Sequence, residues 1–145
     1  MENECVIFLC TGNTARSQMA EAFLRKYAGS HLMAYSAGLK PGAINPYTER
    51  VMREIGVDLS GQHSKSVKEH LGKMSFTYLS TVCAKAEANC PTTFPGIGQR
   101  LSWAFDDPAA VEGSEEEKLQ KFREVRDQIE KRIKLWIAEK GISRE

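Results

Sequence analysis

Two kinds of hydrophobic pattern alternate along this chain. Four short apolar runs have the length and composition of buried strands, and they occupy residues 5–9, 32–36, 76–82 and 101–105. The segments between them favour helices, at about 17–28, 46–55 and 66–73. Strands interleaved with helices are typical of a parallel sheet that lies between helices. The pattern therefore predicts an α/β fold, with a central four-stranded parallel sheet flanked by helices in a single three-layer domain over residues 1–145.

The last third of the chain predicts one long helix, from about Ser114 to Lys140. Its apolar residues recur at steps of three and four, at Leu119, Phe122, Val125, Ile129, Ile133 and Trp136. The same stripe fits a partner-binding face, but we expect it to cover the sheet, because a small sheet needs covering. Ser114 and Glu117 have the spacing of a capping box at the helix start.

Composition excludes several classes of function. The 145 residues are 41% hydrophobic and 27% charged, with a formal net charge of +1, which is ordinary for one globular domain. No broad basic field points to nucleic acid or to an anionic membrane. The first four residues do not resemble a signal peptide, and no apolar stretch approaches a membrane span. We expect a cytoplasmic protein, monomeric, without a nucleic-acid or membrane partner.

The chemistry concentrates where the first strand gives way to the first helix. Cys10 ends the apolar run, and the loop that follows is Thr11, Gly12, Asn13, Thr14, Ala15 and Arg16. Backbone N–H groups at a helix start bind tetrahedral oxyanions and also favour a thiolate. Gly12 allows a tight turn and Asn13 tolerates left-handed geometry. This pattern predicts a loop that holds an anion above a nucleophile.

Two side chains next to this loop strengthen the prediction. The planar fork of Arg16 matches two oxygens of a tetrahedral anion. Ser17 is placed to donate a hydrogen bond to the Cys10 sulfur. Together these groups predict a Cys10 thiol with a lowered pKa, ready to act as a nucleophile at neutral pH. Cys5 lies within the apolar run and is expected to be a core residue.

Cys83 and Cys90 form a second feature. A reducing cytosol disfavours permanent disulfides, and the spacing of the cysteines and histidines does not predict a zinc site. The segment between the two cysteines is rich in alanine and favours a helix, in which seven residues rise about 10 Å. A disulfide needs Cα atoms roughly 4.4–6.8 Å apart, so the pair closes only if that helix unwinds. The spacing leaves open two isolated buried thiols or a switchable redox pair.

The loop resembles the anion loop of the low-molecular-weight tyrosine phosphatase superfamily, and in particular that of its thioredoxin-coupled arsenate reductases. The resemblance covers nearly the whole chain. Beyond the segment from Cys10 to Glu21, it rests on residues 35–38, 81–83, 89–91, 105–108 and 122–127.

The resemblance implies a catalytic set of Cys10, Arg16, Ser17, Cys83, Cys90 and Asp107, with Thr11 to Arg16 binding the oxyanion. Cys10 attacks arsenate, Cys83 takes over the oxidation, and a Cys83–Cys90 disulfide is reduced by thioredoxin. Asp107, directly before Pro108, moves protons, a role carried only loosely to Asp106. No metal or organic cofactor is implied, and phosphate or sulfate would mimic arsenate.

Two alternatives remain open at this point. A phosphatase acting on phosphotyrosine or small phosphate esters needs only Cys10, Arg16 and Asp107. Phosphatases of the superfamily usually carry an aromatic residue where this chain has Ala109, so a small inorganic substrate is favoured. A non-enzymatic redox sensor would use Cys83 and Cys90 to control a partner.

The chain departs from the resembled reductases at two positions. They often carry a further cysteine where this chain has Ala15, but that cysteine takes no part in the relay. Some of them bind potassium through residues that match Asn13, Glu21 and Ser36 together with an aspartate, and the aspartate position is Lys65 here. We expect the lysine ammonium to replace the ion, because two cations repel at close range.

Overall fold

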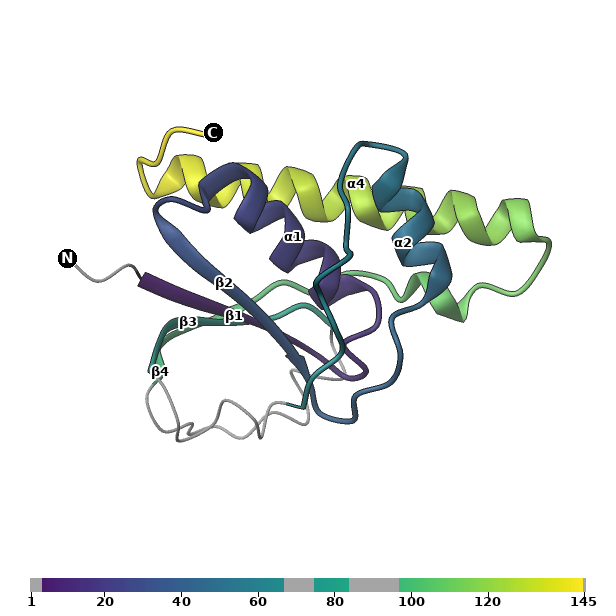
Figure 1. The fold of residues 1–145 in the computed structure, drawn as a ribbon, viewed down its shortest axis with the longest axis horizontal. Helices are drawn as coiled ribbons and strands as arrows, with labels where there is room; N and C mark the ends of the chain where they lie inside the picture. Colours follow the sequence, from purple (N-terminus) through teal and green to yellow (C-terminus); the bar gives the residue numbers. More distant parts are fainter. Residues whose placement is uncertain (1–3, 67–74, 84–96, 145) are drawn as a thin grey trace.

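The computed structural model describes residues 4–66, 75–83 and 97–144. Its centre is a sheet of four parallel strands in the order β2-β1-β3-β4 (Figure 1). The strands are β1 (Glu4–Cys10), β2 (Leu32–Gly38), β3 (Phe76–Thr81) and β4 (Ile97–Ser102). The interior of β1 is almost completely buried, as expected for a central strand with both faces covered. The predicted four-stranded parallel sheet is confirmed.

Three helices flank this sheet within the described residues. They are α1 (Arg16–Ala28), α2 (Pro46–Arg53) and α4 (Glu115–Glu139), and a short 3₁₀ helix, η2, spans Pro108–Ala110. The long helix α4 runs past both α1 and α2 and packs against them (Figure 1). All six apolar residues of its predicted stripe are buried. The stripe is therefore a core face, as predicted.

Local sequence signals explain where two of the helices begin. Asn45 caps α2 by accepting the Tyr47 N–H at 2.9 Å, and Pro46 occupies the first helical position. Ser114 Oγ caps α4 by accepting the Glu117 N–H at 3.2 Å. Both helix starts agree with the sequence prediction.

The last strand is displaced from its predicted position. The sequence predicts residues 101–105, whereas β4 ends at Ser102. The apolar residues that suggested a strand belong partly to the segment that follows, where Trp103 is buried. β4 is an edge strand whose residues are half-buried or exposed, so polar residues such as Gln99 and Arg100 fit within it. An edge strand of this kind lacks the continuous apolar run that marks a central strand.

The topology determines where a ligand site is expected. The chain leaves β1 for β2 on one side of the sheet and later places β3 on the other side of β1. Parallel sheets bind ligands at the carboxyl ends of their strands, at such a switch point. Cys10 is the last residue of β1, and Cys83 follows the end of β3. Of the predicted helix over 66–73, Ser66 forms a bridge with Gly38, and residues 67–73 lie outside the described residues, as does the segment from residue 84 through Cys90.

Within the part of the chain that the structure describes, no helix has both the length and the apolar character needed to cross a bilayer.

Candidate active site

A tight loop joins β1 to α1 and surrounds the Cys10 thiol. Cys10 is only 3% exposed, and α1 begins at Arg16. Asn13 has a φ of 53°, in the left-handed region that asparagine tolerates better than most residues. The loop is therefore narrow enough to place a helix start close to the thiol, as the sequence predicts.

The carbonyl groups of this loop are held by partners outside it. Those of Cys10, Thr11 and Gly12 accept the N–H groups of Leu39, Lys40 and Gly42 at 3.2, 2.8 and 3.0 Å. Those of Asn13 and Thr14 accept Gln18 Nε2 and the Asn45 N–H at 3.0 and 3.1 Å. In a trans peptide the N–H points away from the carbonyl of the same unit. The N–H groups of residues 11–15 are therefore directed away from these partners, as in loops that form an anion-binding cradle.

Gly38, at the end of β2, makes this close packing possible. A Cβ atom at Gly38 would lie 2.9 Å from Thr11 O, 3.0 Å from Asn13 N and 3.0 Å from Gly12 C. All three contacts are backbone atoms of the loop, which cannot move aside as a flexible side chain would. Only a glycine fits here without displacing the cradle.

The variant Gly38→Ala is expected to lose roughly tenfold or more in kcat/KM, because a small displacement of a binding loop has effects of this order. The measurement is hydrolysis of p-nitrophenyl phosphate, with circular dichroism to confirm folding. Gly98→Ala is a matched control, since its Cβ would lie 2.8 Å from Thr77 O at the opposite end of the sheet. Equal losses of activity in the two variants would contradict a specific role for Gly38.

Arg16, the first residue of α1, lies close to Asp107. Arg16 Nη1 donates to Phe105 O at 3.0 Å, and Arg16 Nη2 lies 3.9 Å from Asp107 Oδ2. The Asp107 side chain is half exposed, and its Oδ1 accepts the Ala109 N–H at 3.0 Å. The arginine is thus held at the end of the loop with a carboxylate beside it, the arrangement expected for anion binding and proton transfer.

Asp106 faces a different partner. Its Oδ2 accepts Lys121 Nζ at 2.9 Å, on the surface of α4. The two adjacent aspartates thus have different partners, and Asp107 is the one that contacts Arg16. The geometry supports the stronger expectation for Asp107 and the weaker one for Asp106.

Cys83 lies directly beside Cys10. Their sulfur atoms are 3.8 Å apart, within reach of an S–H···S hydrogen bond. Thr11 Oγ1 lies 3.7 Å from the Cys83 sulfur. Cys83 is only 2% exposed, although 73 positions separate it from Cys10 in the chain. The fold therefore brings together two of the three predicted relay thiols, while Cys90 lies outside the described residues.

The pKa of Cys10 is raised, whereas the sequence predicts that it is lowered. The adjoining Cys83 thiol and burial raise the pKa of Cys10 above its ordinary value, whereas the Arg16 guanidinium and the Gly12 N–H lower it. The raising causes outweigh the lowering ones. The sequence shows the loop and the arginine but not the second sulfur, which comes from another strand.

Replacing Cys83 by alanine is expected to lower the Cys10 pKa, since the hydrogen bond to Cys83, the largest of the effects that raise it, is removed. More of Cys10 is then thiolate at neutral pH, and its alkylation by iodoacetamide becomes faster. Mass spectrometry of the Cys10 peptide across a pH series gives the midpoint in each protein. A midpoint that stays in place or rises would show that Cys83 does not control this thiol.

Ser17 is buried and belongs to the wall of the loop. Its hydroxyl oxygen accepts Asn13 Nδ2 at 2.8 Å. The contacts described for Ser17 do not include the predicted bond to the Cys10 sulfur. In this structure Ser17 braces Asn13, and through it the left-handed turn of the loop.

Three further residues of the site were not singled out by the sequence analysis. Gln18 Nε2 donates to Asn13 O at 3.0 Å, Thr48 Oγ1 to Thr14 O at 3.1 Å, and Ser64 Oγ to Gly12 O at 3.2 Å. Thr48 and Ser64 come from segments far along the chain. No pattern in one sequence links Thr48 and Ser64 to the loop. Gln18 differs, because it directly follows Ser17 in the sequence and so lies next to the loop.

The sequence of nearly the whole chain matches a known family model. Residues 5–145 match the model of the low molecular weight phosphotyrosine protein phosphatase. The chain belongs to this family. The loop after Cys10, with Arg16 at its end and Asp107 nearby, therefore occurs in a chain whose family includes phosphotyrosine phosphatases by name.

Relatives within the family carry a different activity in their names. An arsenate reductase of Halalkalibacterium halodurans is 45% identical over 141 residues, which cover 97% of this chain and 99% of that protein. An arsenate reductase of Bacillus subtilis is 42% identical over 134 residues, covering 92% and 95%.

Solved structures of arsenate reductases share the fold. One in the oxidized state aligns with a TM-score of 0.77 at 28% identity, and one in the phosphate-binding state with 0.75 at 27%; each alignment covers 94% of this chain and 98% of the other. The thioredoxin-dependent arsenate reductase of Corynebacterium glutamicum aligns with 0.60 at 27%, over 92% of this chain and 63% of that one.

Proposed function

We propose that this protein reduces arsenate to arsenite in the cytoplasm, through a relay of Cys10, Cys83 and Cys90 that thioredoxin regenerates, and so serves arsenic detoxification. The observation that carries the proposal is the 3.8 Å separation of the sulfurs of Cys10, at the start of the loop, and Cys83, which follows β3. Ester hydrolysis does not need a second thiol next to the nucleophile, whereas a thiol relay does. The arsenate reductases among the relatives support the same assignment.

In this proposal the cradle and Arg16 bind arsenate. The N–H groups directed into the loop surround its oxygens, and the guanidinium spans two of them. Binding replaces the contact of Arg16 with Asp107, whose oxygen lies 3.9 Å from the guanidinium. Asp107 then stands beside the leaving oxygen, where a proton has to be delivered.

The first step joins sulfur to arsenic. The Cys10 thiol and HAsO₄²⁻ give Cys10–S–AsO₃²⁻ and water, and the thiol proton leaves with the departing hydroxide, assisted by Asp107. A raised pKa of Cys10 is compatible with this step, because the proton that the thiol holds is consumed by the leaving group. Arsenic remains pentavalent at this point.

Electron transfer occurs in the second step. Cys83 attacks the Cys10 sulfur, a Cys10–Cys83 disulfide forms, and arsenite leaves with the bonding electron pair and the Cys83 proton. The 3.8 Å contact places the attacking sulfur next to its target before the reaction begins. Thr11 Oγ1, 3.7 Å from Cys83, is placed to donate a hydrogen bond to that sulfur as it loses its proton.

The remaining steps restore the enzyme. Cys90 attacks Cys83, which releases the Cys10 thiol and leaves a Cys83–Cys90 disulfide. A dithiol reductant such as thioredoxin then reduces that disulfide by the same exchange chemistry. The thioredoxin-dependent relative from Corynebacterium glutamicum supports this choice of reductant.

A coupled assay tests the proposal. Purified protein is supplied with arsenate, thioredoxin, thioredoxin reductase and NADPH, and NADPH oxidation is followed by absorbance. We expect sustained turnover that requires both arsenate and thioredoxin. NADPH oxidation at a rate that does not depend on arsenate, or no NADPH oxidation, would reject the reductase assignment. It would also favour the redox-sensor alternative.

Phosphatase activity is the second candidate, and the family match favours it. The same loop can bind phosphate esters, and Cys10, Arg16 and Asp107 are sufficient for their hydrolysis. We expect weak hydrolysis of p-nitrophenyl phosphate as a side activity. A kcat/KM for phosphotyrosine far above that for arsenate would make the phosphatase the principal function.

A further inference from the structure

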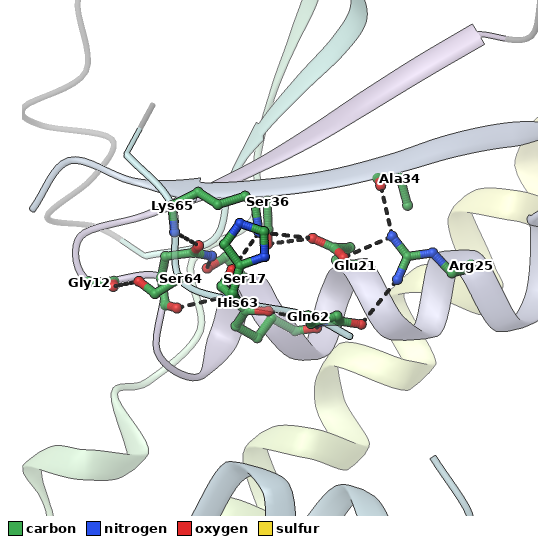
Figure 2. A network of polar contacts seen from close by, with 12 residues as sticks. Gly12, Ser17, Glu21, Arg25, Ala34, Ser36, Gln62, His63, Ser64 and Lys65 are labelled. Atoms are coloured by element: carbon green, nitrogen blue, oxygen red, sulfur yellow. Dashed lines mark hydrogen bonds and ion pairs between the residues drawn. The ribbon is translucent and has the colours of Figure 1, made fainter. Parts of the chain in front are cut away.

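A buried carboxylate lies directly behind the anion loop. Glu21, on α1, is only 4% exposed. Its Oε1 accepts the Ser36 hydroxyl at 2.6 Å, and its Oε2 accepts Arg25 Nη2 at 2.8 Å (Figure 2). A buried charge of this kind needs a cation to compensate it.

Lys65 supplies a second cation to this carboxylate. Its Nζ lies 3.7 Å from Glu21 Oε1 and donates to His63 O at 2.6 Å. Its side chain is 12% exposed, whereas the side chain of Arg25 is 52% exposed. Lys65 is therefore the more enclosed of the two cations, on the loop side of Glu21 (Figure 2).

The backbone of Lys65 connects this ion pair to the anion loop. The Lys65 N–H donates to Asn13 Oδ1 at 2.8 Å, and Asn13 occupies the left-handed turn of the loop. Lys65 O accepts the N–H of Gly38, which touches the other side of the loop. A shift of Lys65 therefore acts on Asn13 and Gly38 together.

These contacts do not fit a potassium ion of the kind that some of the resembled reductases bind. The resembled site needs an oxygen ligand at position 65, but an ammonium group stands there, 3.7 Å from the carboxylate that would hold the ion. A potassium ion this close to the ammonium group would meet strong repulsion.

We propose that the Lys65 ammonium is a built-in replacement for a monovalent cation, and that it holds the anion loop in its binding conformation through Glu21 and Asn13. Lys65 is a positioning residue, since its action passes through these two side chains. The proposal deepens the proposed function but depends only on oxyanion binding, so it can be tested with inorganic phosphate.

The experiment compares wild type with Lys65→Ala in KCl, NaCl and choline chloride at equal ionic strength. The readouts are the rise in Tm caused by Tris-neutralised phosphate, and kcat/KM for arsenate. Wild type should respond alike in the three salts. Lys65→Ala should lose roughly tenfold in kcat/KM in choline chloride, with a smaller phosphate-induced rise in Tm, and regain most of both in KCl, because a small cation can enter next to Glu21.

Lys131→Ala, which removes an exposed lysine on α4, is the matched control and should behave as wild type. Equal losses in all three salts, no loss in any salt, or a wild type that potassium activates over sodium would each overturn the proposal. If Lys65→Ala does not fold, Lys65→Met and the wild-type salt comparison decide the question. The Tm arm uses phosphate alone, so it remains decisive if arsenate reduction is absent.

Discussion

Replacing Cys83 by serine is expected to abolish multiple turnover with arsenate while leaving ester hydrolysis intact. The coupled rate should fall by about 10³-fold or more, since the only thiol described next to Cys10 is lost and arsenite cannot leave with its electrons. Hydrolysis of p-nitrophenyl phosphate needs only Cys10, Arg16 and Asp107, so it should continue at or above the wild-type rate. The coupled arsenate assay and the p-nitrophenyl phosphate assay are both measured on one protein preparation.

Cys5→Ala is the matched control for this variant. Cys5 is a half-buried thiol in β1 that takes no part in the proposed relay, and its removal should leave both activities in place. Cys90→Ser should reproduce the Cys83 result under multiple turnover. Equal losses of reduction and hydrolysis in Cys83→Ser would indicate damage to the loop and not a broken relay.

Replacing Arg16 by lysine is expected to reduce kcat/KM for both arsenate and p-nitrophenyl phosphate, by about 10²–10³-fold. A lysine keeps the charge but lacks the planar fork that spans two oxygens of the anion. It also lacks the second nitrogen, so it cannot bind Phe105 O and approach Asp107 at once as Arg16 does. Steady-state kinetics with each substrate, over a range of concentrations, provide the comparison.

Arg53→Lys, on the exposed surface of α2, controls for the general effect of the exchange. It should leave both rates unchanged. A loss in Arg16→Lys that affects arsenate alone would contradict a shared anion-binding site. Retention of both activities would show that a point charge is sufficient.

The parts of the fold that follow local rules were predictable from the sequence. β1, the loop and α1 are consecutive, so the apolar run, Cys10 and Arg16 define them together. α4 was predicted nearly to its ends, because its apolar period and the Ser114 cap both lie within the helix itself. β4 was misplaced because an edge strand with polar residues such as Arg100 has no such local signature.

The parts of the site that depend on distant segments were not predictable. The rise in the Cys10 pKa depends on Cys83, which β3 brings next to Cys10, and on burial. The close approach of Gly38 to the loop depends on how β2 pairs with β1. The resemblance drew attention to Cys83 and Lys65. The distances from Cys83 to Cys10 and from Lys65 to Glu21, which support their roles, are visible only in the fold.

The transfer of oxidation from Cys10 through Cys83 to Cys90 is tested most directly by mapping disulfides after one turnover. Reduced protein is mixed with arsenate in the absence of thioredoxin, alkylated and digested, and its crosslinked peptides are identified by mass spectrometry. We expect a Cys83–Cys90 disulfide with Cys10 alkylated as a free thiol, and a Cys10–Cys83 disulfide in the Cys90→Ser variant. Arsenite formed without a bond between Cys83 and Cys90 would contradict this expectation.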